Sequence, residues 1–212
     1  MKKLKDELVK LKPEDRLYQV AHPVIGLTGG IATGKTTVSR LFAKEGIPVV
    51  SADALVKTVY EKIETIKFIN ENWPSAVNKN EVDFSILRKI AFSEDSNREK
   101  IEQFIYARMS EAFKEHYSMF KNPSLMVYDV PLLFEKGLAP LVDISICVYA
   151  PREIQVKRLL ERDGTNLELA EKILSAQIDI EDKKEAADFI IDNSRGLDEL
   201  NSNFKKLLKK IS

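Results

Sequence analysis

Residues Gly29 to Thr36 follow the spacing G-x-x-x-x-G-K-T, with a lysine and a threonine directly after the second glycine. Glycines let a loop turn tightly around phosphate, and the N–H groups of such a loop point at phosphate oxygens. A lysine adds a point charge for the β- and γ-phosphates, and a threonine hydroxyl can bind Mg²⁺. The pattern therefore predicts a P-loop for a nucleoside triphosphate, with Lys35 on the phosphates and Thr36 on the metal.

The segments on either side of this loop support the same interpretation. Residues 24–27 are apolar and predict a short buried strand, and residues 37–45 predict a helix with one apolar face. The positive end of that helix dipole would add to phosphate binding. The expected nucleotide contacts from the motif are Gly29, Gly30, Ile31, Ala32, Thr33, Gly34, Lys35, Thr36 and Thr37.

The composition is that of a soluble globular protein. The chain has 212 residues, of which 44% are hydrophobic and 31% charged. Lys plus Arg and Asp plus Glu both number 33, and this balance argues against a nucleic-acid partner. The single cysteine, Cys147, fits a reducing compartment. No apolar run approaches the roughly 20 residues that span a membrane, and there is no secretory signal, so we expect a cytoplasmic protein without a membrane partner.

Further strands and helices alternate along the chain. Besides the strand before the loop, strands are predicted at residues 47–50, 124–128, 143–149 and 189–191, and a last helix carries an apolar stripe from Leu197 to Ile211. Alternating strands and helices predict an α/β fold with a five-stranded parallel sheet and helices on both faces. In residues 1–22, leucines at positions 4, 8 and 11 predict a helix that Pro13 ends.

Polar side chains follow the predicted strands at the sheet edge where ligands bind in such folds, namely Asp53, Asp129, Glu135 and Asn193. Asp53 is placed to accept the proton of an alcohol acceptor, and its alternative role is the N-cap of the helix that follows. Asp129 ends an apolar strand. An acid at that position can bind Mg²⁺ directly or through a water molecule, so Asp129 is a candidate metal ligand.

Two arginines lie four positions apart in a predicted helix. Arg158 and Arg162 would therefore share one helix face, where two cations repel each other. An anionic ligand is one reason for such a pair. The alternative is a solvated face on which Glu161 and Asp163 balance the charge.

Taken together, these stretches resemble the dephospho-CoA kinase family. The resemblance covers residues 24 to about 200, and the P-loop is its least specific part. The matching stretches are residues 25–31, 34–36, 52–54, 129–135, 137–138 and 150–152, then Gln155, Arg158, Leu159, residues 162–164, Gln177, Lys183, Ala187, Asp188 and residues 191–193.

The resemblance implies that ATP, with Mg²⁺, phosphorylates the ribose 3′-hydroxyl of dephospho-CoA, the last step of coenzyme A synthesis. It implies a monomer or small homo-oligomer built on a P-loop kinase fold. After an extension at 1–22, the implied parts are a core at 23–57, 123–150 and 186–212, a helical CoA-binding domain at 58–122 and a lid at 151–185.

The resemblance also assigns roles to particular residues. Asp53 would be the catalytic base, and Lys35 and Arg158 would act with it in catalysis. Arg158 and Arg162 would be lid cations that close on the ATP phosphates, and Asn193 would lie near the adenine.

The sequence departs from the usual family pattern at Ser51, Phe84, Tyr106, Ala107 and Ser110. All but the first fall in the part implied to bind the acceptor. Two alternatives therefore stay open at this point. One is a P-loop kinase of another small alcohol or nucleotide, and the other is a nucleotide-binding module without catalysis.

Overall fold

The computed structural model describes residues 2–121, 123–163 and 165–212, without the side chains of residues 162 and 163. The chain divides into two compact units. One unit, called here the core unit, comprises Met1–Val50 and Lys121–Ser212. The other, called the inserted unit, comprises Ser51–Phe120.

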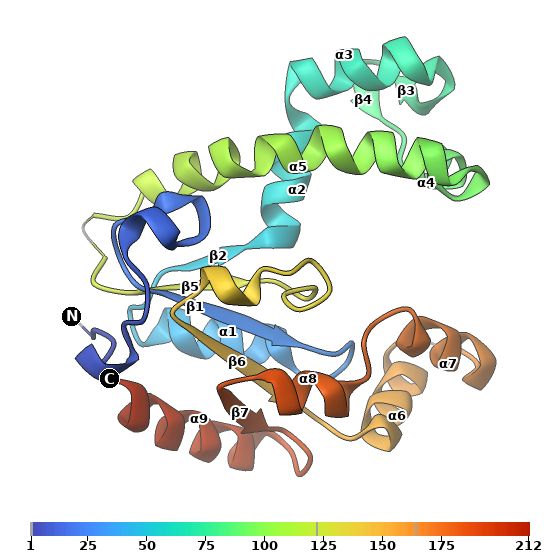
Figure 1. Ribbon diagram of the computed structural model, residues 1–212. Helices are drawn as coiled ribbons and strands as arrows, with labels where there is room; N and C mark the ends of the chain where they lie inside the picture. Colours follow the sequence, from blue (N-terminus) through green and yellow to red (C-terminus); the bar gives the residue numbers. More distant parts are fainter. Residues whose placement is uncertain (1, 122, 164) are drawn as a thin grey trace. The chain divides into compact units, whose positions relative to one another are not determined.

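A five-stranded parallel sheet forms the centre of the core unit (Figure 1). Its strands, in the order β2-β5-β1-β6-β7, are β2 (Val49–Ser51), β5 (Met126–Asp129), β1 (Val24–Gly29), β6 (Ile144–Tyr149) and β7 (Phe189–Asp192). In the register of the central strands, Ile25 lies between Val127 and Ile144. The predicted α/β fold with its parallel sheet is confirmed, so the carboxyl ends of the strands lie along one edge.

Helices cover both faces of this sheet. The helices of the core unit are α1 (Lys35–Lys44), α6 (Arg152–Asp163), α7 (Leu167–Ser175), α8 (Ile180–Ala186) and α9 (Leu197–Ile211). Helices α1 and α9 share one face, where Phe42 and Phe204 meet edge to face with ring centroids 4.9 Å apart. Alternate residues of β6 point into that cluster, while Cys147 between them belongs to the opposite face, near Lys183 of α8.

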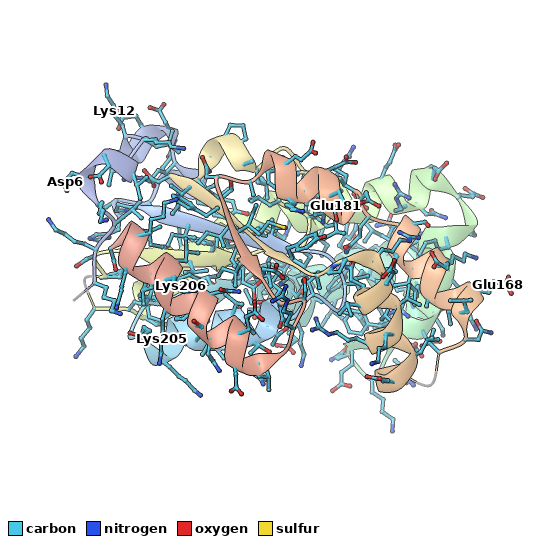
Figure 2. The ribbon with its side chains drawn as sticks, turned by 90° about the horizontal axis from the view of Figure 1, so that it is seen from below. Asp6, Lys12, Glu168, Glu181, Lys205 and Lys206 are labelled. Carbon is cyan, nitrogen blue, oxygen red and sulfur yellow. The ribbon has the colours of Figure 1, made fainter. Side chains whose placement is uncertain are left out.

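Helix α9 is amphipathic, as its apolar stripe predicted. Its buried residues are Leu200, Phe204, Leu207, Leu208 and Ile211. Lys205 and Lys206 lie on its outer side, as Figure 2 shows. Burial of the apolar stripe against the sheet therefore holds α9 in place.

The prediction of a helix in residues 1–22, which Pro13 would end, is wrong. Short 3₁₀ turns occur instead at Asp6–Leu8, Pro13–Asp15 and Leu17–Gln19. Leu4 is buried in the same apolar cluster as α1 and α9, and the N–H of Lys5 donates to the carbonyl of Ile211 at 2.9 Å. These contacts with the core hold the segment in an irregular path, so packing outweighed the helical spacing of its leucines.

A buried ion pair fastens this segment to the start of β6. The Nε of Arg16 donates to Asp143 at 2.8 Å, and the two side chains are 4% and 0% exposed. Arg16 also donates to the carbonyls of Leu11 and Ala21, while Asp143 accepts the N–H of Val24 at 2.8 Å. Because both charges are hydrogen-bonded on several sides, their burial is compensated.

The inserted unit is mainly helical, as the sequence predicted. Its helices are α2 (Ala52–Glu61), α3 (Ile63–Asn72), α4 (Phe84–Ser93) and α5 (Asp95–Ser118). The sequence did not reveal a small hairpin between β3 (Val77–Asn78) and β4 (Glu81–Val82). Its turn residues Lys79 and Asn80 have φ values of 48° and 62°, as a tight hairpin turn requires. Among the described residues of either unit, no helix combines the length and apolar character needed to cross a membrane.

Candidate active site

The loop between β1 and α1 has the backbone that its glycines allow. Gly34 has φ 95° and directly precedes α1, and Gly29 has φ 156° at the end of β1. A Cβ on Gly29 would lie 2.6 Å from the carbonyl oxygen of Val148, closer than real Cβ contacts come. Larger residues would therefore displace the loop from β6 or strain its turn into α1.

Lys35 and Asp129 form the charged centre beside this loop. The Nζ of Lys35 pairs with Oδ1 of Asp129, and the Oγ of Ser39 donates to Oδ2 of the same carboxylate. Lys35 and Ser39 lie one helical turn apart on α1, so both reach the acid at the end of β5. Both side chains of the ion pair are largely buried, which strengthens their interaction relative to a surface pair.

Thr36 and Asp129 supply the oxygens that the sequence assigned to a magnesium ion. Thr36 lies exposed in the first turn of α1, and Asp129 is 7% exposed. A hydroxyl and a carboxylate suit Mg²⁺, which binds through a few protein oxygens together with substrate phosphates and water. The donor set of these two residues thus fits a metal held jointly with a nucleotide.

Side chains from outside the motif hold the carbonyl side of the loop. Nε2 of Gln155 donates to the carbonyl of Ile31 at 2.6 Å. Nη1 of Arg158 donates to the carbonyl of Ala32 at 3.1 Å, and its Nη2 donates to the carbonyl of Asn193 at 2.7 Å. Gln155 and Arg158, which lie one turn apart on α6, therefore both donate to carbonyl groups of the loop, and Arg158 also donates to Asn193.

Asn193 follows β7 and lies beneath the loop. Its Nδ2 donates to the carbonyl of Thr33 at 2.7 Å, and a Cβ on Gly34 would come within 2.3 Å of that nitrogen. The residue is 5% exposed, and its Oδ1 has no hydrogen-bond partner within the described parts of the chain. The structure thus brings Asn193, Arg158 and the loop together. The side chain of Arg162 lies outside the described residues, although its backbone belongs to α6.

Glu135 makes a buried ion pair at the same edge of the sheet. Its Oε1 lies 2.6 Å from Nζ of Lys183, which is fully buried and also donates to the carbonyl of Pro131 at 3.0 Å. The pair joins the loop after β5 to α8. Because both acceptors of the Lys183 ammonium belong to the loop after β5, the pair has the geometry of a structural ion pair that holds this loop to α8.

Asp53 belongs to the inserted unit and lies exposed in the first turn of α2. The N-cap of α2 is Ser51, whose side chain accepts the N–H of Ala54 at 3.3 Å. The alternative role of Asp53 as N-cap is therefore wrong, and its carboxylate is exposed to solvent.

The sequence did not predict that Ser39 and Gln155 support the loop and its charged centre. Ser39 lies four positions after Lys35, and that spacing on one helix face was the available signal. Gln155 matches the family pattern, but its contact with the loop carries no sequence signal, since its partner Ile31 is 124 positions away.

A P-loop that joins the first strand of a parallel sheet to its helix, beside a lysine and a buried acid, defines a P-loop nucleotide-binding protein. The family profile described as dephospho-CoA kinase matches residues 23–199. The chain therefore belongs to the dephospho-CoA kinase family, and the resemblance seen in the sequence is confirmed.

Individual relatives agree with this assignment. The dephospho-CoA kinase of Fusobacterium nucleatum is 36% identical over 190 residues, which cover 89% of this chain and 94% of the relative. The enzyme of Arabidopsis thaliana is 37% identical over 202 residues, covering 89% and 83%. Among solved structures, a Thermus thermophilus protein has a TM-score of 0.80 at 29% identity and covers 90% of this chain and 99% of its own. A dephospho-CoA kinase from Campylobacter jejuni has a TM-score of 0.63 at 25% identity, covering 90% and 98%.

Proposed function

We propose that the core unit binds ATP and that the inserted unit binds the acceptor, dephospho-CoA. As a member of its family the chain is a phosphotransferase of the last step of coenzyme A synthesis. It transfers the γ-phosphate of ATP to the ribose 3′-hydroxyl and releases coenzyme A and ADP. The observation that carries this proposal is the family match over residues 23–199, which includes both the P-loop and the inserted unit.

The donor roles follow from the loop and the residues beside it. The N–H groups of residues 30–36 would bind the phosphate oxygens, and Lys35 would neutralise charge on the β- and γ-phosphates. Thr36 and Asp129 would hold the magnesium ion, which neutralises charge on the phosphate oxygens when it is bound. In phosphoryl transfer most of the catalysis is positioning and charge neutralisation, and these residues supply both.

Asp53 would be the base that activates the hydroxyl group of the acceptor. Its exposed carboxylate would accept the proton of the 3′-hydroxyl as that oxygen bonds to the γ-phosphorus. The bond from the γ-phosphorus to the bridging oxygen then breaks, and its electron pair leaves with ADP. Arg158 and Arg162 of α6 would stabilise the charge on the transferring group from the lid.

The function is tested by measuring ADP production with purified protein, ATP and Mg²⁺ against a panel of acceptors. We expect turnover with dephospho-CoA and none above the ATPase background with adenosine, nucleoside monophosphates or pantothenate. Turnover confined to one of the other acceptors would replace the proposed substrate. Binding of ATP without turnover on any acceptor would favour a non-catalytic nucleotide-binding protein. Size-exclusion chromatography of the same preparation tests the expected monomer or small homo-oligomer.

A further inference from the structure

Three consecutive carbonyl groups of the P-loop accept hydrogen bonds from side chains outside the motif. The carbonyls of Ile31, Ala32 and Thr33 are bound by Gln155, Arg158 and Asn193, respectively. Because each peptide group is planar, fixing a carbonyl oxygen also fixes the direction of the N–H on the other side of the same bond. The donors on the carbonyl side therefore set where the N–H groups of this loop point.

Gln155 makes the shortest of these contacts. Its Nε2 lies 2.6 Å from the carbonyl oxygen of Ile31, and the residue is only 3% exposed. Among described residues, Arg158 also bonds outside the loop, to the carbonyl of Asn193. Gln155 instead donates to the loop itself, so this side chain is fixed by the P-loop and fixes it in return.

Gly30 leaves the space that Gln155 occupies. A Cβ on Gly30 would lie 2.4 Å from Nε2 of Gln155, while the next atoms, from Ile180 and Thr33, would lie at an ordinary 3.4 Å. Gly30 has no φ in the left-handed region, so its backbone would accept an alanine. The side chain of Gln155 is thus the main obstacle to a larger residue at this position. Gly29 and Gly34 differ, because both have positive φ.

We infer that Gln155 is a positioning residue of the nucleotide site, and that Gly30 is small because it must admit the Gln155 amide. This inference rests on the proposed binding of ATP to the loop. Gln155 acts through the peptide group of Ile31 and not by contact with the phosphates. It ties α6 to the loop separately from Arg158, so Arg158 can contact phosphate while α6 stays attached to the loop.

A double-mutant cycle with Gly30→Ala, Gln155→Ala and the double variant tests this interlock. The readouts are the equilibrium dissociation constant of ATP, measured by calorimetry, and the separate KM values for ATP and for dephospho-CoA. Loss of one buried hydrogen bond is expected to weaken ATP binding about tenfold in each single variant. The double variant should bind ATP no more weakly than either single variant, because removal of the amide makes room for the new methyl group. The KM for dephospho-CoA should stay unchanged.

Two further variants separate this role from general stability. Gln103→Ala makes the same neutral change at an exposed position of α5 and should leave ATP binding unchanged. Gln155→Met keeps the length of the side chain without the donor, so it should fill the site. Its melting temperature should lie closer to that of the wild type than the melting temperature of Gln155→Ala does. ATP binding should still be weakened, because the hydrogen bond to Ile31 is lost.

The results that would overturn the inference are distinct from a failure of the proposed function. Wild-type affinity for ATP in both Gln155→Ala and Gln155→Met would remove Gln155 as a positioning residue. Losses that multiply to about a hundredfold in the double variant would show that the nucleotide itself, and not Gln155, requires a glycine at position 30. A wild-type protein that binds no ATP would overturn the proposed function as well.

Discussion

The core unit and the inserted unit place their candidate binding residues in opposite surroundings. In the core unit, Gln155, Arg158 and Asn193 are bonded to the backbone of the loop or its neighbour, and the Lys35–Asp129 pair is mostly buried. In the inserted unit, Asp53 is exposed in a first helical turn, and Phe84 and Tyr106 are 49% and 44% exposed. The residues proposed for ATP are thus held by hydrogen bonds and an ion pair within the core unit, whereas those proposed for the acceptor lie on an exposed surface.

A hollow of about 470 Å³ lies in the inserted unit beside one of the departures from the family pattern. Phe84 lines it, and the rings of Tyr60 and Phe84 meet edge to face with centroids 5.1 Å apart. Lys57 and Glu61 add opposite charges to the same hollow. At Phe84, where the sequence departs from the family pattern, the hollow is therefore lined by an aromatic pair beside two opposite charges.

The largest expected effect comes from Lys35→Ala in the core unit. Removal of the charge that serves the β- and γ-phosphates should lower kcat/KM for ATP about 10³-fold. Lys44→Ala, at the exposed end of the same helix, is the matched control and should retain wild-type kinetics. Steady-state rates at varied ATP check both variants, and normal turnover by Lys35→Ala would contradict the P-loop assignment.

Asp53→Asn tests the base that we propose in the inserted unit. Loss of the base should lower kcat about 10²- to 10³-fold, because the amide cannot accept the proton of the acceptor hydroxyl. The affinity for ATP should stay unchanged, since Asp53 belongs to the inserted unit. Asp95→Asn removes an exposed acid from the first turn of α5 and serves as the control. An unaffected kcat in Asp53→Asn would remove this residue as the base.

Arg16→Met tests whether the segment before the family match belongs to the core unit. It leaves the carboxylate of Asp143 buried without its cation, which should cost about 3 kcal/mol in the free energy of unfolding. Arg98→Met removes an exposed partner of Glu102 in the inserted unit and should cost less than about 1 kcal/mol. Denaturant unfolding measures both, and equal losses would show that the Arg16–Asp143 pair is not an important fastening.

The smallest effect is expected for chemical labelling of the folded protein. Burial raises the pKa of the Cys147 thiol to about 12, so at pH 8 the thiol stays protonated and should not react with iodoacetamide. Labelling should begin only when denaturant opens the core unit. The fluorescence of Trp73, the single tryptophan, reports on the inserted unit in the same samples. Rapid labelling of the native protein would contradict the packed face beneath α8.

The sequence predicted the parts of this molecule that depend on local pattern. The P-loop, the strands that follow it and the apolar stripe of α9 were all recognisable, because period and glycine spacing are local properties. The first 22 residues were misjudged, because their path is fixed by distant partners such as Asp143 and Ile211. The hairpin at residues 77–82 was missed, because each of its strands has only two residues.

The candidate site was predictable to the same extent. The sequence predicts Lys35, Asp129, Arg158 and Asn193 as site residues, and the structure brings them to the loop. The bond from Gln155 to Ile31 could not be foreseen, since nothing local relates two residues so far apart in the chain. The roles of these residues and of Asp53 in catalysis stay predictions, and the variants above test them.

The most direct test of the proposed reaction follows the phosphoryl group from ATP to its acceptor. Wild-type protein is incubated with ATP labelled in its γ-phosphate, Mg²⁺ and dephospho-CoA, and the product is analysed by chromatography and mass spectrometry. We expect the label to appear in coenzyme A, on the ribose 3′-hydroxyl, in amounts equal to the ADP formed. Label released as free phosphate, or carried by another acceptor while dephospho-CoA is unchanged, would contradict the proposed reaction.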